Sequence, residues 1–96
     1  MREIRFFLDW GPKYPLWETG TDKYAMEPSD YGLSSELDKA LRNYVDFWNT
    51  HFIETDDRFE WDSSENKEYF EAEGNRLIQS LRDEVKDRAH VRDERS

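Results

Sequence analysis

Residues 34–52 read SSELDKALRNYVDFWNTHF, and this stretch decides the fold. Its apolar side chains recur three and four positions apart, at Leu37, Ala40, Leu41, Tyr44, Val45, Trp48 and Phe52. Because an α-helix turns once in 3.6 residues, these side chains form one apolar stripe, with Phe47 outside it. Ser34 or Ser35 is a favourable N-cap, and Glu36 and Asp38 suit the positive end of the helix dipole. The stretch predicts an amphipathic helix over 34–52.

A second helix is predicted over residues 63–86, with Asp62 as its cap. Its apolar stripe comprises Phe70, Gly74, Leu77, Ile78, Leu81 and Val85. Glycine inside a helix costs up to about 1 kcal/mol relative to alanine. We therefore expect Gly74 to mark the close approach of a bulky side chain, with Trp48 of the first helix as the candidate.

Strands are expected at both ends of the chain. Residues 3–10 alternate polar and apolar side chains before Gly11-Pro12, and residues 88–92 alternate weakly. Between them lie a long connection over 11–33 and a loop over 53–62. The predicted order is strand, long loop, helix, helix, strand.

This order predicts one small α+β domain over residues 1–96, with two long antiparallel helices and a small sheet. The expected core comprises Ile4, Phe6, Leu8, Leu37, Leu41, Val45, Trp48, Phe70, Leu77, Ile78, Leu81 and Val91. Residues 93–96 are expected to fray. A two-stranded sheet is marginal alone, so either the helices cover it or a second copy extends it across a sheet edge as a homodimer.

The composition excludes several classes of protein. The net charge is −9, and charged residues make up 39% of the chain against about 25% in typical domains. An aromatic content of 16% nevertheless favours a folded chain over a disordered one. Excess acid disfavours binding to nucleic acid, and no apolar run is long enough to cross a membrane. Since no signal-peptide pattern opens the sequence, we expect a cytoplasmic protein.

No catalytic or metal-binding pattern is present, so we expect neither enzymatic activity nor a cofactor. Cysteine is absent, and His51 and His90 lie far apart in the sequence without a metal-ligand spacing. The acidic run 56–62 lacks the glycine of an EF-hand and carries bulky aromatic residues. With 23 acids, pairs of carboxylates carry no specific signal for hydrolysis.

The negative charge is concentrated in residues 54–73, which hold nine acids and two bases. One interpretation is a surface that binds a basic protein, because complementary charge speeds association and selects partners. The alternative is a solvated helix face whose acids favour the helix N-terminus. The candidate partner-binding residues are Asp56, Asp57, Glu60, Glu65, Glu68 and Glu71.

An aromatic loop over residues 10–31 is the second candidate site. Its large side chains are Trp10, Tyr14, Trp17, Tyr24 and Tyr31. Exposed tryptophan and tyrosine are typical anchors of binding surfaces, so the loop is a candidate site for a small molecule or a peptide. The other interpretation is a lid that supplies apolar area to a small core.

The chain also resembles a group of small, acidic bacterial proteins of uncharacterised function. The matching positions are Pro15-Leu16-Trp17, Pro28, Gly32-Leu33-Ser34, Leu37, Leu41, Trp48, Trp61, Glu73-Gly74, Leu77 and Leu81. The resemblance implies one intact domain and assigns no site residue.

Size and acidity favour a non-enzymatic protein that binds a basic protein through its acidic surface. A toxin-neutralising, immunity-like role and mimicry of nucleic acid are two forms of this hypothesis. A small-molecule or peptide binder that uses the aromatic loop is the alternative.

Overall fold

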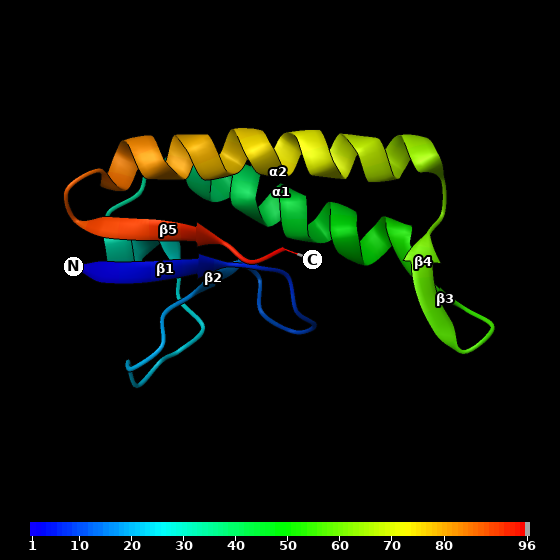
Figure 1. The fold of residues 1–96 in the computed structure, drawn as a ribbon, viewed down its shortest axis with the longest axis horizontal. Helices are drawn as coiled ribbons and strands as arrows, with labels where there is room; N and C mark the ends of the chain where they lie inside the picture. The colour runs from blue at the N-terminus through cyan, green and yellow to red at the C-terminus, as the bar shows by residue number, and fades with distance from the viewer. Residues whose placement is uncertain (96) are drawn as a thin grey trace.

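Two helices lie side by side above a small sheet in the computed structural model, which describes residues 1–95 (Figure 1). Helix α1 spans Ser35–His51, and α2 spans Ser64–Val85 and returns along it. The predicted α+β class with two long antiparallel helices is confirmed. The sheet lies under one end of the helices, and a hairpin projects from the other end.

The sheet has three strands, one more than the sequence analysis predicts. Strand β1 (Arg2–Phe6) is central, with β5 (Ala89–Asp93) parallel on one side and β2 (Leu16–Trp17) antiparallel on the other. The long connection thus returns to the sheet through β2 and then forms a short 3₁₀ helix, η1 (Pro28–Tyr31). β2 is only two residues long, too short for its own periodicity to reveal it.

Serine residues cap both long helices. The Ser34 hydroxyl accepts a hydrogen bond from the Leu37 N–H, and the Ser63 hydroxyl accepts one from the Asn66 N–H, each at 3.1 Å. The prediction that Asp62 caps the second helix is wrong by one position. Its carboxylate instead binds side chains of His51 and Asn66.

The prediction of a loop over residues 53–62 is also wrong, because the segment is a β-hairpin. Strand β3 (Phe52–Thr55) pairs antiparallel with β4 (Arg58–Trp61). The turn between them consists of Asp56 and Asp57, which have φ angles of 45° and 72°. Two consecutive positive φ angles characterise the type I′ turn, whose twist matches that of a hairpin, and Asp tolerates this region better than most residues.

The core lies between the helices and the sheet. Of the predicted core residues only Leu8 is not buried. Sequence analysis did not assign several others to the core, namely Leu16, Trp17, Met26, Tyr31, Tyr44, Val85 and Ala89. Four of these belong to the long connection, which therefore covers the sheet as a lid.

The last described residues continue from β5 along the body of the protein. The Glu94 N–H donates a hydrogen bond to the Phe6 carbonyl at 3.0 Å. The Arg95 guanidinium donates to Asp93 at 2.9 Å and to the Asn75 side chain at 2.7 Å. Residues 93–95 belong to the segment predicted to fray, and in the structure they make these hydrogen bonds to the rest of the chain. Ser96 lies outside the described residues.

Gly74 lies against Tyr44 and Arg95, so the expectation that Trp48 approaches it is wrong. A Cβ atom placed on Gly74 would overlap the Tyr44 hydroxyl and the Arg95 guanidinium. The reason is the register of the two helices, which brings Tyr44, one turn before Trp48, opposite Gly74. Trp48 packs instead on Trp10 and Phe52, with ring centroids 4.1 and 5.6 Å away.

An acid-sensitive ion pair ties the lid to the sheet. Glu18, 8% exposed, accepts hydrogen bonds from the Tyr31 hydroxyl at 2.7 Å and from Arg2 Nε at 3.1 Å. Burial opposes ionisation, but the bonds from Arg2 and Tyr31 outweigh it and hold the pKa of Glu18 below its ordinary value. Ionised Glu18 therefore stabilises the fold at neutral pH.

The variant Glu18→Gln is expected to lose about 1–3 kcal/mol of unfolding free energy at pH 7. Since the folded pKa is lower than the unfolded one, the contribution is complete above about pH 4.3 and disappears as the pH falls through the folded value. Urea unfolding of both proteins at pH 7 and pH 3 measures this difference. A difference that stays constant between the two pH values would contradict the assignment.

Candidate functional site

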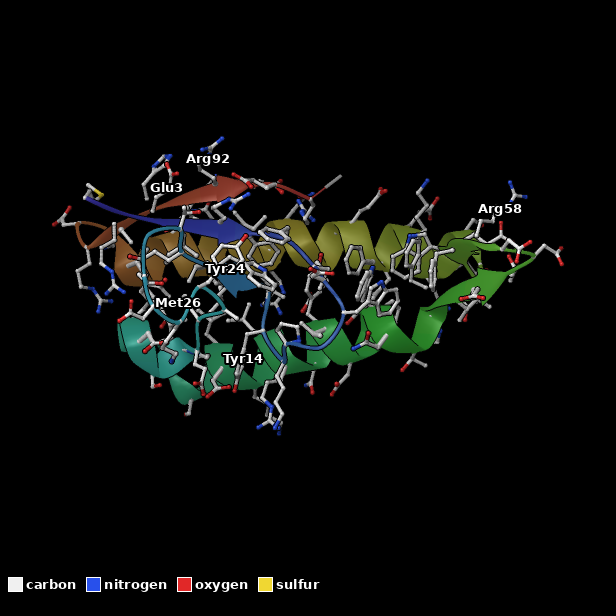
Figure 2. All side chains as sticks on the ribbon, turned by 90° about the horizontal axis from the view of Figure 1, so that it is seen from below. Glu3, Tyr14, Tyr24, Met26, Arg58 and Arg92 are labelled. Carbon is white, nitrogen blue, oxygen red and sulfur yellow. The ribbon has the colours of Figure 1, made fainter. Side chains whose placement is uncertain are left out.

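The β3–β4 hairpin extends beyond the helical layer and carries much of the acidic segment (Figure 1). Asp56 and Asp57 form the turn at its tip, and Glu60 lies on β4. Arg58 marks this end of the molecule in Figure 2, at the opposite end from Glu3 and Arg92 of the sheet. The acidic tip is therefore held away from the body of the domain.

The other three predicted partner-binding residues lie on α2. Glu65, Glu68 and Glu71 are spaced three residues apart, which places them along one face of the helix. All six candidate acids are exposed, and only Glu60 has an ion pair within residues 1–95, to Arg58 at 4.0 Å. Apart from Glu60, the candidate carboxylates on the hairpin and at the start of α2 thus have no cationic partner within residues 1–95.

A hydrogen-bonded network fixes the hairpin to both helices at its base. His51 Nδ1 lies 2.7 Å from Asp62 Oδ2, and Asn66 Nδ2 donates to Asp62 Oδ1 at 2.8 Å. The Asp62 N–H donates to the His51 carbonyl at 2.9 Å. The bonds from Asn66 and His51 lower the pKa of Asp62. The network orients the acidic tip relative to the helices.

The aromatic loop does not form a single exposed face. Trp17 and Tyr31 are buried, and the Tyr14 hydroxyl donates a hydrogen bond to Asp38 at 2.7 Å. Tyr24 is 41% exposed and packs on Trp17, with ring centroids 5.1 Å apart (Figure 2). Trp10 lies apart from the other aromatic residues of the loop and contacts Trp48. The structure therefore supports the lid interpretation for most of the loop.

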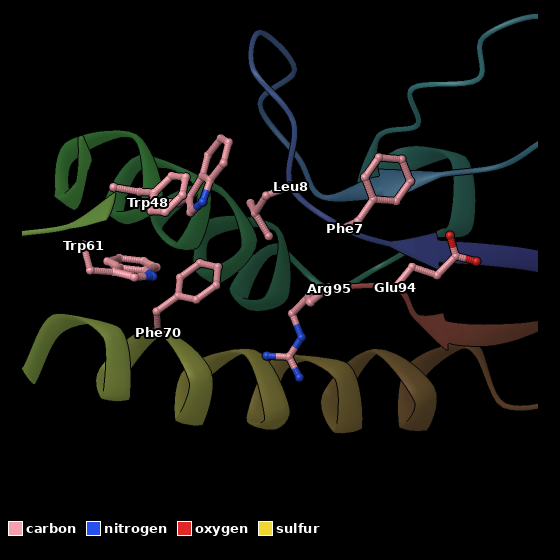
Figure 3. Close-up of a pocket in the computed structure, with 8 residues that line it drawn as sticks. Phe7, Leu8, Trp48, Trp61, Phe70, Glu94 and Arg95 are labelled. Carbon is pink, nitrogen blue, oxygen red and sulfur yellow. The ribbon is translucent and has the colours of Figure 1, made fainter. Parts of the chain in front are cut away.

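A hollow of about 240 Å³ lies between the hairpin and the sheet (Figure 3). We call it the aromatic hollow, and its apolar wall consists of Leu8, Trp48, Phe52, Trp61 and Phe70. Glu94 and Arg95 border the end nearest the sheet, where the Arg95 guanidinium points toward α2. The hollow exists because the sheet covers only one end of the helices.

Sequence analysis missed this hollow, because its residues come from five separate segments of the chain. The alternation of Phe59 and Trp61 was the one local signal, since it predicts a strand with an aromatic face. Phe70 and Trp48 were assigned to the core, which is where most aromatic residues on a helix stripe belong.

Residues 2–92 match the model of a protein family described as Serratia CdiI immunity protein-like. The chain belongs to this family. The match covers both helices, the hairpin and nearly all of the sheet, and it replaces the broader resemblance to small acidic bacterial proteins. No curated protein matches the sequence.

Membership in an immunity-protein family indicates a role in protein–protein interaction, with a toxin as the partner. Immunity proteins are generally non-enzymatic. No helix within residues 1–95 combines the length and the hydrophobicity of a membrane-spanning segment. In the same residues, no three His, Asp or Glu side chains gather where they could hold a metal ion.

The prediction of a homodimer through a sheet edge stays a prediction. Strands β2 and β5 are the two edges of the sheet. On β5 the Arg82 side chain donates to the Val91 carbonyl at 3.0 Å, so one acceptor of that edge already has a partner within the chain.

Proposed function

We propose that the protein is a non-enzymatic immunity protein that neutralises a basic toxin by binding it through the acidic hairpin and the start of α2. The observation that carries the proposal is the family match over residues 2–92. Binding alone is sufficient for such a role, because a bound partner is occluded from its own target. The protein then needs complementary charge and shape, and no reacting group.

The distribution of charge supports this choice of surface. Residues 54–73 carry seven of the nine excess negative charges, on a projecting hairpin and the helix that follows it. Elsewhere, several acids have cationic partners, such as Glu3 with Arg92 and Asp30 with Lys23. A negative surface of this kind accelerates encounter with a basic protein and disfavours acidic ones.

The aromatic-loop alternative has less support. Trp17 and Tyr31 are buried in the core and Tyr14 is half-buried, so the exposed rings of the loop are Tyr24 and, on a different part of the surface, Trp10. We therefore place the partner at the acidic end.

Co-expression with candidate toxin domains from the source genome tests the proposal. Cells that produce the toxin are expected to grow only when this chain is also produced, and the two proteins are expected to copurify as a stoichiometric complex. Growth protection without a complex would contradict binding as the mechanism. Absence of both protection and complex would contradict the immunity role itself.

A further inference from the structure

Two exposed rings, Trp10 and Phe59, pack on Trp48 and Phe52, which belong to the wall of the aromatic hollow. Trp10 and Phe59 are each 46% exposed, which is unusual for side chains of this size, and their centroids lie 5.0 Å apart. Behind them Trp48 lies 4.1 Å from Trp10, and Phe52 lies 5.9 Å from Phe59. Trp10 and Phe59 therefore expose nearly half of their surface while they rest on a packed aromatic base.

The register of the hairpin places a carboxylate beside these rings. Glu54 pairs with Phe59, and Phe52 pairs with Trp61. Because side chains alternate between the two faces of a strand, all four share the face that contacts Trp10. Directly paired side chains have Cβ atoms about 4.5–5.5 Å apart, so the Glu54 carboxylate starts next to the Phe59 ring.

The hairpin's own cation lies on its other face. Arg58 pairs with Thr55, and its guanidinium is directed to Glu60, which shares that face. Glu54 is exposed and has no ion pair within residues 1–95. The rings and the Glu54 carboxylate are therefore open to a cation from outside.

We propose that Trp10, Phe59 and Glu54 form a binding site for an arginine side chain of the toxin. The inference rests on the proposed function and names the chemistry by which the acidic end recognises its partner. The guanidinium stacks on the exposed part of the two rings while Glu54 accepts its N–H groups, and the arginine stem covers the remaining exposed ring surface.

The structure favours arginine over other occupants. A guanidinium is planar and weakly hydrated, so it stacks on aromatic rings more readily than an ammonium. The surrounding hairpin is acidic, which favours a cationic anchor over an anionic one.

The chain itself uses the same contact at its other end. The Arg2 guanidinium lies over the Tyr31 ring at 4.7 Å, and that of Arg5 lies over Phe7 at 5.2 Å. Glu18 binds Arg2, and Glu94 binds Arg5. Each of these rings thus has both a cation and a carboxylate, whereas Trp10 and Phe59 have a carboxylate and no cation within residues 1–95.

The test is an NMR titration of the intact protein with the blocked peptide acetyl-Gly-Arg-Gly-amide. We expect saturable shifts of the Trp10 indole N–H and the Phe59 ring, and weaker binding of the corresponding lysine peptide. The citrulline peptide has the same shape without the charge and is expected to cause no saturable shift. Equal binding of the citrulline peptide would overturn the proposal in favour of an uncharged anchor, as would no binding of the arginine peptide.

Two isosteric variants separate the site from the general negative charge. Glu54→Gln is expected to weaken binding of the arginine peptide about 3- to 5-fold. Asp46→Asn removes the same charge from an exposed position on α1 that has no ion pair within residues 1–95, and it is expected to change binding less than about 2-fold. Equal effects of the two variants would overturn the proposal, because they would indicate screening charge alone.

Trp10→Ala is expected to abolish the saturable shift of Phe59, with the other backbone resonances serving as a check on folding. The peptide assay needs no toxin, so the two proposals fail separately. A protein that binds the arginine peptide but protects no cell would refute the proposed function. A protein that protects cells but does not bind the peptide would refute the arginine site alone.

Discussion

A variant without four exposed acids of the hairpin and α2 is expected to associate with the toxin about 10- to 100-fold more slowly at low salt. The changes are Asp56→Asn, Asp57→Asn, Glu65→Gln and Glu68→Gln. The physical reason is steering: these carboxylates project from the body and have no ion pair within residues 1–95. Association rates at several salt concentrations measure the effect, which should shrink as salt screens the charges.

A matched control variant removes the same charge from other parts of the surface. It carries Asp22→Asn, Glu36→Gln, Asp46→Asn and Asp87→Asn, all at exposed positions without an ion pair within residues 1–95. Glu36 matches Glu65, since each lies in the first turn of a long helix. Asparagine at positions 56 and 57 tolerates the positive φ angles of the turn, so the hairpin should persist. Equal slowing by both variants would contradict an acidic binding surface.

The helices were predictable because their signals are local. The stripe from Leu37 to Phe52 and the serine caps lie within a few residues of the structure that they specify. Errors of one residue remained at the ends, since Asp62 and Ser63 are both good caps and only packing chooses between them.

The hairpin was missed because its turn lacks the usual glycine. The turn residues are Asp56 and Asp57, whereas Asn-Gly or Asp-Gly is the sequence that usually indicates a type I′ turn. Charged residues stand on either side of this turn, and they obscure the short alternation of the two strands. Strand β2 lies inside the predicted connection over 11–33, because two residues are too few to show a period.

The candidate site, like the fold, was predictable only in the part that depends on neighbouring residues. Its acids were predictable as a set because they are neighbours in the sequence. The aromatic hollow was not, because it joins Leu8, Trp48 and Trp61 from distant segments. Trp10 is close to the loop aromatics in the sequence, but in the fold it packs against Trp48 of α1.

Replacing Gly74 with leucine is expected to destabilise the fold by about 1–3 kcal/mol, even though leucine regains up to about 1 kcal/mol of helix propensity. The added side chain meets the Tyr44 hydroxyl and the Arg95 guanidinium. The Arg95 guanidinium is the far end of a long, flexible side chain, so it can move aside. Tyr44 cannot, because its ring stacks on Phe70 at 4.4 Å and contacts Phe6 at 5.9 Å. Urea and thermal unfolding measure the change, and unchanged or raised stability would contradict it.

The Tyr44 hydroxyl makes the cause of this effect testable on its own. It is buried beside Arg95 without a hydrogen bond in residues 1–95, and burial raises the pKa of Tyr44 to about 12, so the group is neutral at ordinary pH. Tyr44→Phe removes an unsatisfied group and is expected to be nearly neutral for stability. In that background Gly74→Ala should cost less than it does in the parent protein, because its methyl group no longer meets an oxygen. If Gly74→Ala costs the same in both backgrounds, the methyl group clashes with Arg95 and not with Tyr44. The contact between α1 and α2 would then not explain the glycine at this position.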